Sequence, residues 1–329
     1  MGLAYDELGS YYEAIKYQNM ALDIKLKIGD KIGEGKCYTY LGITYCNLGE
    51  YYKAIEYHEK SLQIALAMGS MMQQECYANL GIVYGNLGDI QKAIEYHKKA
   101  LEIALSTGNK AGELGSYINL GVTHGKLGDF KNAIEYCERA LEIVQNIPGD
   151  TIEKTTCYIN LGSVYVGLSN FHESIKCYNK ALEISRDIGY QVGEINCYSG
   201  LGTAYDGLGD FQEAIRCHKK SLEIAQIIGD RAGEAGCYNN LGCVYYSIDD
   251  FQQAIKYFNQ SLDINKQIGN KAGEAACYSG LGNVSSALGC FSDAINYHNR
   301  SLEIMLKIRD KSGETKCYGN LGNAYSGLG

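Results

Sequence analysis

The sequence predicts an all-α protein of about eight stacked helical hairpins followed by a final helix, and three observations support this fold class. The dipeptide Leu-Gly recurs from Leu41 to Gly322 at steps of 39, 40, 41, 40, 40, 40 and 40 residues. Apolar and aromatic residues around these pairs follow helical spacing. Glycine occurs 40 times and proline once in 329 residues, so glycine serves as periodic punctuation between helices. Repeats of this length stack into one elongated array rather than several globular domains.

The first helix of each repeat is predicted from its aromatic and aliphatic residues. In the second repeat, Tyr38, Leu41, Tyr45 and Leu48 recur at spacings of 3, 4 and 3. This spacing lines one face of a helix from about residue 33 to 48. A glycine follows, where a left-handed backbone is least costly and the helix ends.

A second, antiparallel helix is predicted after a two-residue turn. It begins near Tyr51, and acidic residues such as Asp89 and Asp210 are expected to cap the equivalent helices of later repeats. Its outer face is expected to be exposed, because it carries opposite charges four residues apart in the favourable order. These pairs are Glu56 with Lys60, Glu95 with Lys99, and Glu135 with Arg139.

The glycine of each Leu-Gly pair is expected in the middle of the first helix, where it costs about 1 kcal/mol relative to alanine. We expect close approach of the second helix to offset this cost. The small residue of the second helix would then face the glycine. Residues in that position are Ala54, Ala93, Ala133, Ser174, Ala214, Ala254 and Ala294.

The repeat resembles a known family. The pattern Tyr-x2-Leu-Gly-x2-Tyr from Tyr38, followed by Ala-x3-His from Ala54, resembles the tetratricopeptide signature, with tyrosine in place of its tryptophan and without its usual proline. The resemblance covers the whole chain. The 40-residue period and the phrase Asn-Leu-Gly-Asn-Ala-Tyr from Asn320 further resemble the LGN/Pins group of G-protein signalling modulators and the long animal tetratricopeptide scaffolds.

This resemblance implies a right-handed superhelical solenoid whose concave wall is made by the first helices and binds a segment of a partner protein. In the LGN/Pins group the partners orient the mitotic spindle. The G-protein-binding GoLoco segments of that group lie outside its repeats, and none is recognisable here, so G-protein regulation is not implied.

The domain organisation is expected to be a single array over residues 1–329 that is a fragment of a longer chain, because the first repeat opens part-way through and the last is partial. The expected repeat boundaries are 1–30, 31–69, 70–109, 110–150, 151–190, 191–230, 231–270, 271–310 and 311–329.

Charge and composition narrow the partners. With 30 basic and 38 acidic residues the net charge is −8, and no basic block could neutralise a row of phosphates, so nucleic acid is not expected. No apolar run is long enough to insert into a membrane. The 13 cysteines include no CxxC pair, and seven of them precede a tyrosine of the first helix, once per repeat. This regularity indicates packed, reduced thiols and a cytoplasmic location.

No catalytic, metal or cofactor site is expected. The histidines His58, His97, His218 and His298 occupy one position of the second helix, 39 to 121 residues apart. No two of them share a helix, so packing is expected rather than metal binding. Cys137, Cys177 and Cys217 recur near that position and are interpreted in the same way.

The candidate peptide-binding groove is assigned to the face of the first helices opposite their core. The position after Leu-Gly changes from apolar in the N-terminal repeats to polar in the C-terminal ones, and the position before it is often asparagine. We expect the N-terminal half of the groove to hold apolar side chains of the ligand and the C-terminal half to bind its backbone amides. Asparagine suits the second task, since an amide both donates and accepts. The assigned residues are Tyr40, Ile43, Asn79, Ile82, Asn119, Val122, Asn160, Asn240, Asn283, Asn320 and Asn323.

Three functional alternatives remain open at this stage. The asparagines can equally bond to neighbouring helices, in which case they serve stability rather than binding. The first functional interpretation is a peptide-binding adaptor, the second is a scaffold that associates with itself, and the third is an array that regulates an enzyme domain outside these residues. The sequence does not identify the partner.

Overall fold

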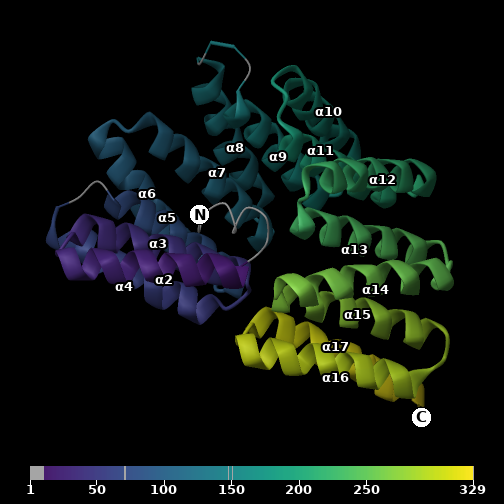
Figure 1. Ribbon diagram of the computed structural model, residues 1–329. Helices are drawn as coiled ribbons and strands as arrows, with labels where there is room; N and C mark the ends of the chain where they lie inside the picture. The colour runs from purple at the N-terminus through teal and green to yellow at the C-terminus, as the bar shows by residue number, and fades with distance from the viewer. Residues whose placement is uncertain (1–10, 70–71, 147, 150, 329) are drawn as a thin grey trace. The chain divides into compact units, whose positions relative to one another are not determined.

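The computed structural model describes residues 11–69, 72–146, 148–149 and 151–328. Within these residues the chain forms sixteen α-helices and no strand (Figure 1), which confirms the all-helical class. The predicted opening of the first repeat, at residues 1–10, lies outside them. The helices are α2 (Tyr11–Ile28), α3 (Lys31–Asn47), α4 (Tyr51–Ala67), α5 (Met72–Leu87), α6 (Ile90–Thr107), α7 (Lys110–Leu127), α8 (Phe130–Gln145), α9 (Ile152–Gly167), α10 (Phe171–Asp187), α11 (Gln191–Gly207), α12 (Phe211–Ile228), α13 (Arg231–Ser247), α14 (Phe251–Ile268), α15 (Lys271–Ala287), α16 (Phe291–Ile308) and α17 (Lys311–Leu328).

Contacts divide the chain into two compact units. The first unit comprises residues 1–57 and 229–329, and the second comprises residues 58–228. In the first unit, Tyr11 and Leu48 form a buried cluster with Ala235, Ile264 and Ile268, so helices from both ends of the sequence share a core. The second unit contains α5 to α12, in which each helix packs against the next along the chain. That residues 1–329 form a single array stays a prediction.

Helix ends follow the predicted chemistry. The carboxylate of Asp89 accepts from the backbone N–H of Lys92 at 3.2 Å, and that of Asp210 accepts from the N–H of Glu213 at the same distance. These bonds satisfy donors that the first turn leaves without a helical partner. Gly108 ends α6 with φ +67°, the left-handed conformation that glycine adopts without strain.

The predicted partner of the mid-helix glycine is wrong. A Cβ atom added to Gly202 would lie 2.5 Å from the His218 ring, and one added to Gly282 would lie 2.5 Å from the His298 ring. The space beside the mid-helix glycine, the glycine notch, is therefore filled by the residue four positions after the small residue of the second helix. The small residue instead faces the first helix one turn after that glycine, since a Cβ on Gly85 would be 3.6 Å from the Cβ of Ala93. A ring needs more room than a methyl group, which explains why the notch is glycine and not alanine.

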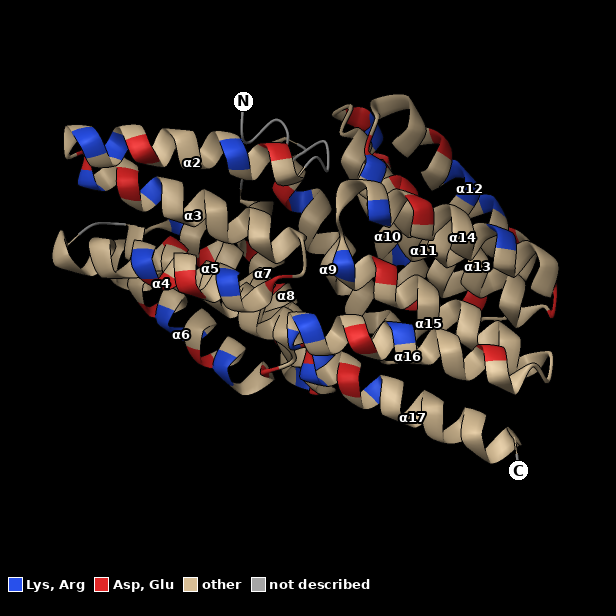
Figure 2. Ribbon diagram, turned by 60° about the horizontal axis from the view of Figure 1, so that its bottom comes forward, with Lys and Arg blue, Asp and Glu red and all other residues tan. Residues whose placement is uncertain are grey.

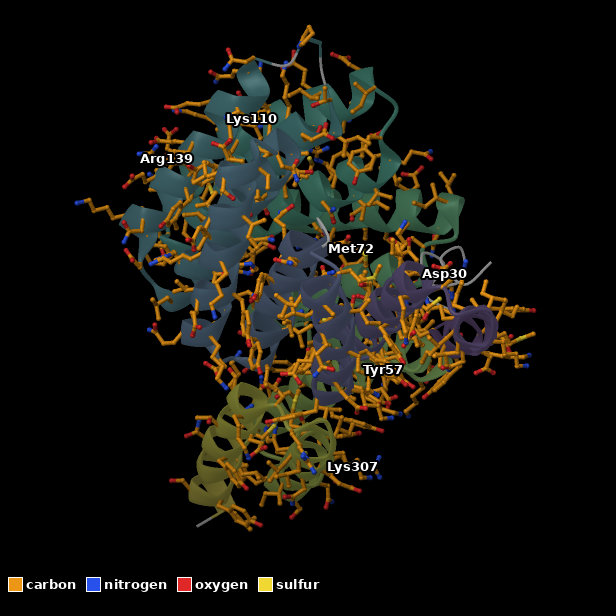
Figure 3. The ribbon with its side chains drawn as sticks, turned by 90° about the vertical axis from the view of Figure 1, so that its left-hand side faces the viewer. Asp30, Tyr57, Met72, Lys110, Arg139 and Lys307 are labelled. Carbon is orange, nitrogen blue, oxygen red and sulfur yellow. The ribbon has the colours of Figure 1, made fainter. Side chains whose placement is uncertain are left out.

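Stacked aromatic rings fill the other side of the hairpins. Tyr57 of α4, labelled in Figure 3, lies between two tyrosines of α3, with its ring centroid 5.4 Å from that of Tyr45 and 6.1 Å from that of Tyr38. Tyr96 repeats this arrangement with Tyr84 and Tyr77 at 5.4 and 6.1 Å. Such offset stacks add to the free energy of simple burial.

We predict that Tyr198→Ala lowers the free energy of unfolding by about 3 to 5 kcal/mol, as is typical of aromatic-to-alanine changes in a core. Tyr198 is 7% exposed and belongs to a cluster with Tyr178, Leu201 and Cys217. Urea unfolding followed by circular dichroism measures the change. An unfolding free energy within 0.5 kcal/mol of wild type, the usual range of surface substitutions, would contradict the burial of this ring.

Candidate peptide-binding groove

The assigned groove residues lie on the first helices of the hairpins. In the second unit, α5, α7, α9 and α11 contact one another in order, which places their equivalent positions side by side. In the first unit, α13, α15 and α17 do the same. Of the assigned residues, Ile82, Asn283 and Asn323 are exposed and the others are partly buried. The assignment of these side chains to a binding surface stays a prediction.

Few charges lie on this surface. The second half of α17 carries no charged residue (Figure 2), and α9, α13 and α15 likewise carry none beyond their first turns. A surface of this kind suits backbone amides and apolar side chains better than a strongly charged ligand.

Two of the polar side chains on this face already have partners in the neighbouring hairpin. The amide of Asn320 donates to the hydroxyl of Ser279 at 3.1 Å, across α17 and α15. The ammonium of Lys126 donates to the amide oxygen of Asn86 at 3.3 Å, between equivalent positions of α7 and α5. Asn320 therefore bonds to a neighbouring hairpin, as the structural alternative expects.

The residue before Leu-Gly varies with the side chain at the position of His58 in the second helix of the preceding repeat. Where that side chain is histidine or cysteine, the next repeat has asparagine before Leu-Gly. Where it is tyrosine or phenylalanine, the next repeat has glycine there. A Cβ on Gly200 would lie 2.2 Å from the Tyr178 ring, so the larger ring leaves no room for a side chain. The pairs are His58 with Asn79, His97 with Asn119, Cys137 with Asn160, Tyr178 with Gly200, His218 with Asn240, Phe258 with Gly280, and His298 with Asn320.

The four histidines are each 1% exposed, which confirms that they pack. Burial lowers the pKa of His58, His97 and His218 from 6.5 to about 4, because a charged imidazole loses its hydration there. In each, as in His298, Nδ1 is buried without a hydrogen-bond partner among the described residues. The rings are therefore neutral packing elements at neutral pH.

Asp206 lies on the face of the first helices to which the groove is assigned, and the sequence reasoning did not single it out. It lies on α11, five residues after Leu201; in the other repeats only Asp6 of the partial first repeat is acidic at the equivalent position. Its Oδ1 atom is buried and has no hydrogen-bond partner among the described residues. Burial raises the pKa of this carboxyl above its usual 3.8. The available signal was that Asp206 is the only acidic residue at this position among the eight repeats aligned from Leu41 to Leu321.

The seven cysteines that precede a tyrosine of the first helices are all buried. Burial raises the pKa of Cys157 and Cys197 to about 12, which keeps these thiols protonated and unreactive. Across the described helices and turns, no three His, Cys, Asp or Glu side chains come close enough to hold a metal ion. The same helices include none long and apolar enough to cross a bilayer.

Comparison with known families gives the decisive observation. The tetratricopeptide repeat profile matches residues 1–67, 38–106, 71–146, 112–187, 154–227 and 194–267, which together cover most of the chain. The chain belongs to the tetratricopeptide repeat family. A search of curated proteins finds no match for this tetratricopeptide chain.

Solved structures show the same fold in other proteins. The apo form of the quorum sensor NprR from B. thuringiensis matches with a TM-score of 0.64 and 18% identity, over 92% of this chain and 86% of that one. A Rap protein complexed with competence and sporulation factor matches with a TM-score of 0.62 and 13% identity, over 98% and 97%. BtubC from P. vanneervenii matches with a TM-score of 0.52 and 22% identity, over 68% and 91%. At these identities the likeness concerns the fold alone.

Proposed function

We propose that this tetratricopeptide array is a cytoplasmic protein-interaction adaptor that holds an extended peptide segment against its first helices. The observation that carries the proposal is Asp206, a partly buried carboxylate whose Oδ1 has no partner within the described chain. Leaving such an atom unpaired costs about 1 to 3 kcal/mol. A partner that supplies a donor would recover that cost, so we expect a peptide with a lysine, an arginine or a free amino terminus near Asp206.

The neighbouring surface supports this proposal. The groove helices around Asp206 carry mostly uncharged side chains, and Ile82 is 40% exposed on α5 of the same unit. The structural relatives include a Rap protein solved with competence and sporulation factor, which is consistent with peptide binding by this fold. The finer resemblance to the LGN/Pins group would imply a partner in spindle orientation.

The proposal is tested with a peptide selected from a phage-displayed library on the immobilised chain. We expect Asp206→Asn to weaken its binding at least tenfold, while Asp187→Asn, an exposed aspartate on α10, leaves the affinity unchanged. The variant with Asn79, Asn119, Asn160 and Asn240 changed to alanine separates the two roles of the asparagines. Lost affinity with an unchanged melting temperature indicates binding, whereas a lowered melting temperature with unchanged affinity indicates packing.

Self-association is the second candidate. It is favoured by exposed aromatic side chains on α17, where Tyr318 and Tyr325 are each 56% exposed. Sedimentation velocity over a hundredfold range of concentration tests it. A chain that stays monomeric throughout, and yields a selected peptide sensitive to Asp206→Asn, would leave the adaptor as the function.

A further inference from the structure

A charged cavity of about 700 Å³ lies in the first unit, and none of the assigned groove residues lines it. Its walls come from the start of α4, the N-terminal half of α15 and the C-terminal half of α16. Five basic and three acidic side chains line it, in a protein whose net charge is −8. This volume falls in the range of sites that bind small molecules.

The three carboxylates of the cavity are already neutralised by lysines. Each forms a short ion pair with a lysine three or four residues away on its own helix or turn. Lys307, labelled in Figure 3, marks the α16 side of the cavity. The pairs are Lys53 with Glu50 at 2.6 Å, Lys271 with Glu274 at 2.6 Å, and Lys307 with Glu303 at 2.7 Å.

Two guanidinium groups, those of Arg300 and Arg309, therefore remain without a carboxylate among the described residues. At the position of Arg300, three other repeats hold a basic residue that follows a glutamate by four residues, but here that earlier residue is Asn296. The Arg300 guanidinium instead lies 5.7 Å from the centre of the Tyr278 ring. The contrasting pairs are Lys99 with Glu95 at 2.6 Å and Arg139 with Glu135 at 3.4 Å.

Arg309 occupies a backbone position that otherwise belongs to glycine. It ends α16 with φ +57°, a left-handed conformation that costs free energy for any residue with a Cβ. Its guanidinium lies 5.4 Å from the centre of the Tyr52 ring. Glycine with positive φ ends the equivalent helices at Gly29, Gly69, Gly108, Gly189, Gly229 and Gly269. Arg309 therefore stands where the backbone favours glycine.

We propose that this cavity binds an oxyanion, either carboxylate or phosphate, through Arg300 and Arg309. A planar guanidinium matches both anions with two parallel hydrogen bonds. Tyr278 and Tyr52 hold the two guanidiniums by cation–π contact, which leaves their N–H edges available to a ligand. The apolar body of the ligand would contact Ile304, which also lines the cavity.

Calorimetric titration at low ionic strength tests this site with three probes: pyrophosphate, citrate and the peptide Glu-Glu-Tyr-Glu-Glu. Because they carry phosphate, free carboxylate and peptide carboxylate, the probe that binds identifies the source of the anion. We expect one-to-one binding of at least one probe. Arg300→Gln and Arg309→Gly should each weaken it at least tenfold, whereas Arg139→Gln, at the position equivalent to Arg300 but paired with Glu135, should leave it unchanged.

The melting temperature of the free protein separates binding from a structural role. Arg309→Gly restores the residue that the backbone favours, so we expect it to melt at the same or a higher temperature while losing the probe. Asp206→Asn should retain probe binding, because Asp206 does not line the cavity. The proposal is overturned if no probe binds saturably, if either arginine variant binds like wild type, or if Arg139→Gln loses as much affinity.

Discussion

Gly200→Asn is expected to destabilise the second unit by about 3 kcal/mol, at the upper end of the usual cost of overpacking. The substitution places at this position the residue that five other repeats carry there. In this repeat, however, a Cβ would lie 2.2 Å from the Tyr178 ring, which is 5% exposed and packed against Gly162 as well. Because the ring is buried, a side chain at position 200 has to displace it from its packed position.

A compensating change should restore the stability. Tyr178→His recreates the histidine and asparagine pair found elsewhere, so the double variant Tyr178→His with Gly200→Asn should recover most of the loss. A coupling energy of about 2 to 3 kcal/mol is expected from the double-mutant cycle. Urea unfolding of the four proteins measures it.

Gly115→Asn provides the matched control for this cycle. Gly115 lies in α7 of the same unit, and a Cβ there would meet nothing within 4 Å. Its substitution should change the unfolding free energy by less than about 1 kcal/mol, as for an exposed helix position. If Gly200→Asn and Gly115→Asn had equal effects, the proposed dependence of the asparagine on the preceding ring would be wrong.

Acidification is expected to unfold the second unit well before its surface carboxylates are protonated. Burial lowers the pKa of His58, His97 and His218 from 6.5 to about 4. The neutral rings therefore contribute stability that is complete above pH 6.5 and is lost as the pH falls toward 4. At pH 5 the loss is on the order of 2 kcal/mol for each ring.

Urea midpoints measured at pH 7.5 and pH 5 test this expectation. The chain itself offers the control, since Cys137 occupies the same position in another repeat and burial raises the pKa of its thiol to about 12. Changing His58, His97 and His218 together to cysteine should remove most of the pH dependence between these values. Equal wild-type midpoints at pH 7.5 and pH 5 would contradict the lowered pKa values.

The local structure was predictable because it depends on neighbours in sequence. The spacing of Tyr38 and Leu41 and the capping carboxylate of Asp89 act within one or two turns, and the helices were predicted within a few residues of their observed ends. The contacts between hairpins were less accessible. Which side chain fills the glycine notch depends on how two helices pack, so the prediction of an alanine rather than His218 was wrong.

The candidate sites show the same division. The groove face follows from helical periodicity, but the burial of Asp206 Oδ1 and the absence of a partner for it depend on the packing of several hairpins. The cavity with Arg309 needs helices more than 200 residues apart in sequence, since Tyr52 lies on α4 and Arg309 ends α16. No periodicity within one repeat indicates such a pairing.

The pairing of Tyr178 with Gly200, and of His97 with Asn119, restricts which hairpin can follow which along the chain. Each hairpin presents a side chain of one size at this position, and the next hairpin accepts only a side chain for which its own residue before Leu-Gly leaves room. Copies that look interchangeable in an alignment are therefore not interchangeable in the protein. Recombination or engineering that places the Tyr178 hairpin before one with asparagine at the position before Leu-Gly would bring the ring and the asparagine into collision. An exchange between two hairpins that both carry histidine at the position of Tyr178 would be tolerated.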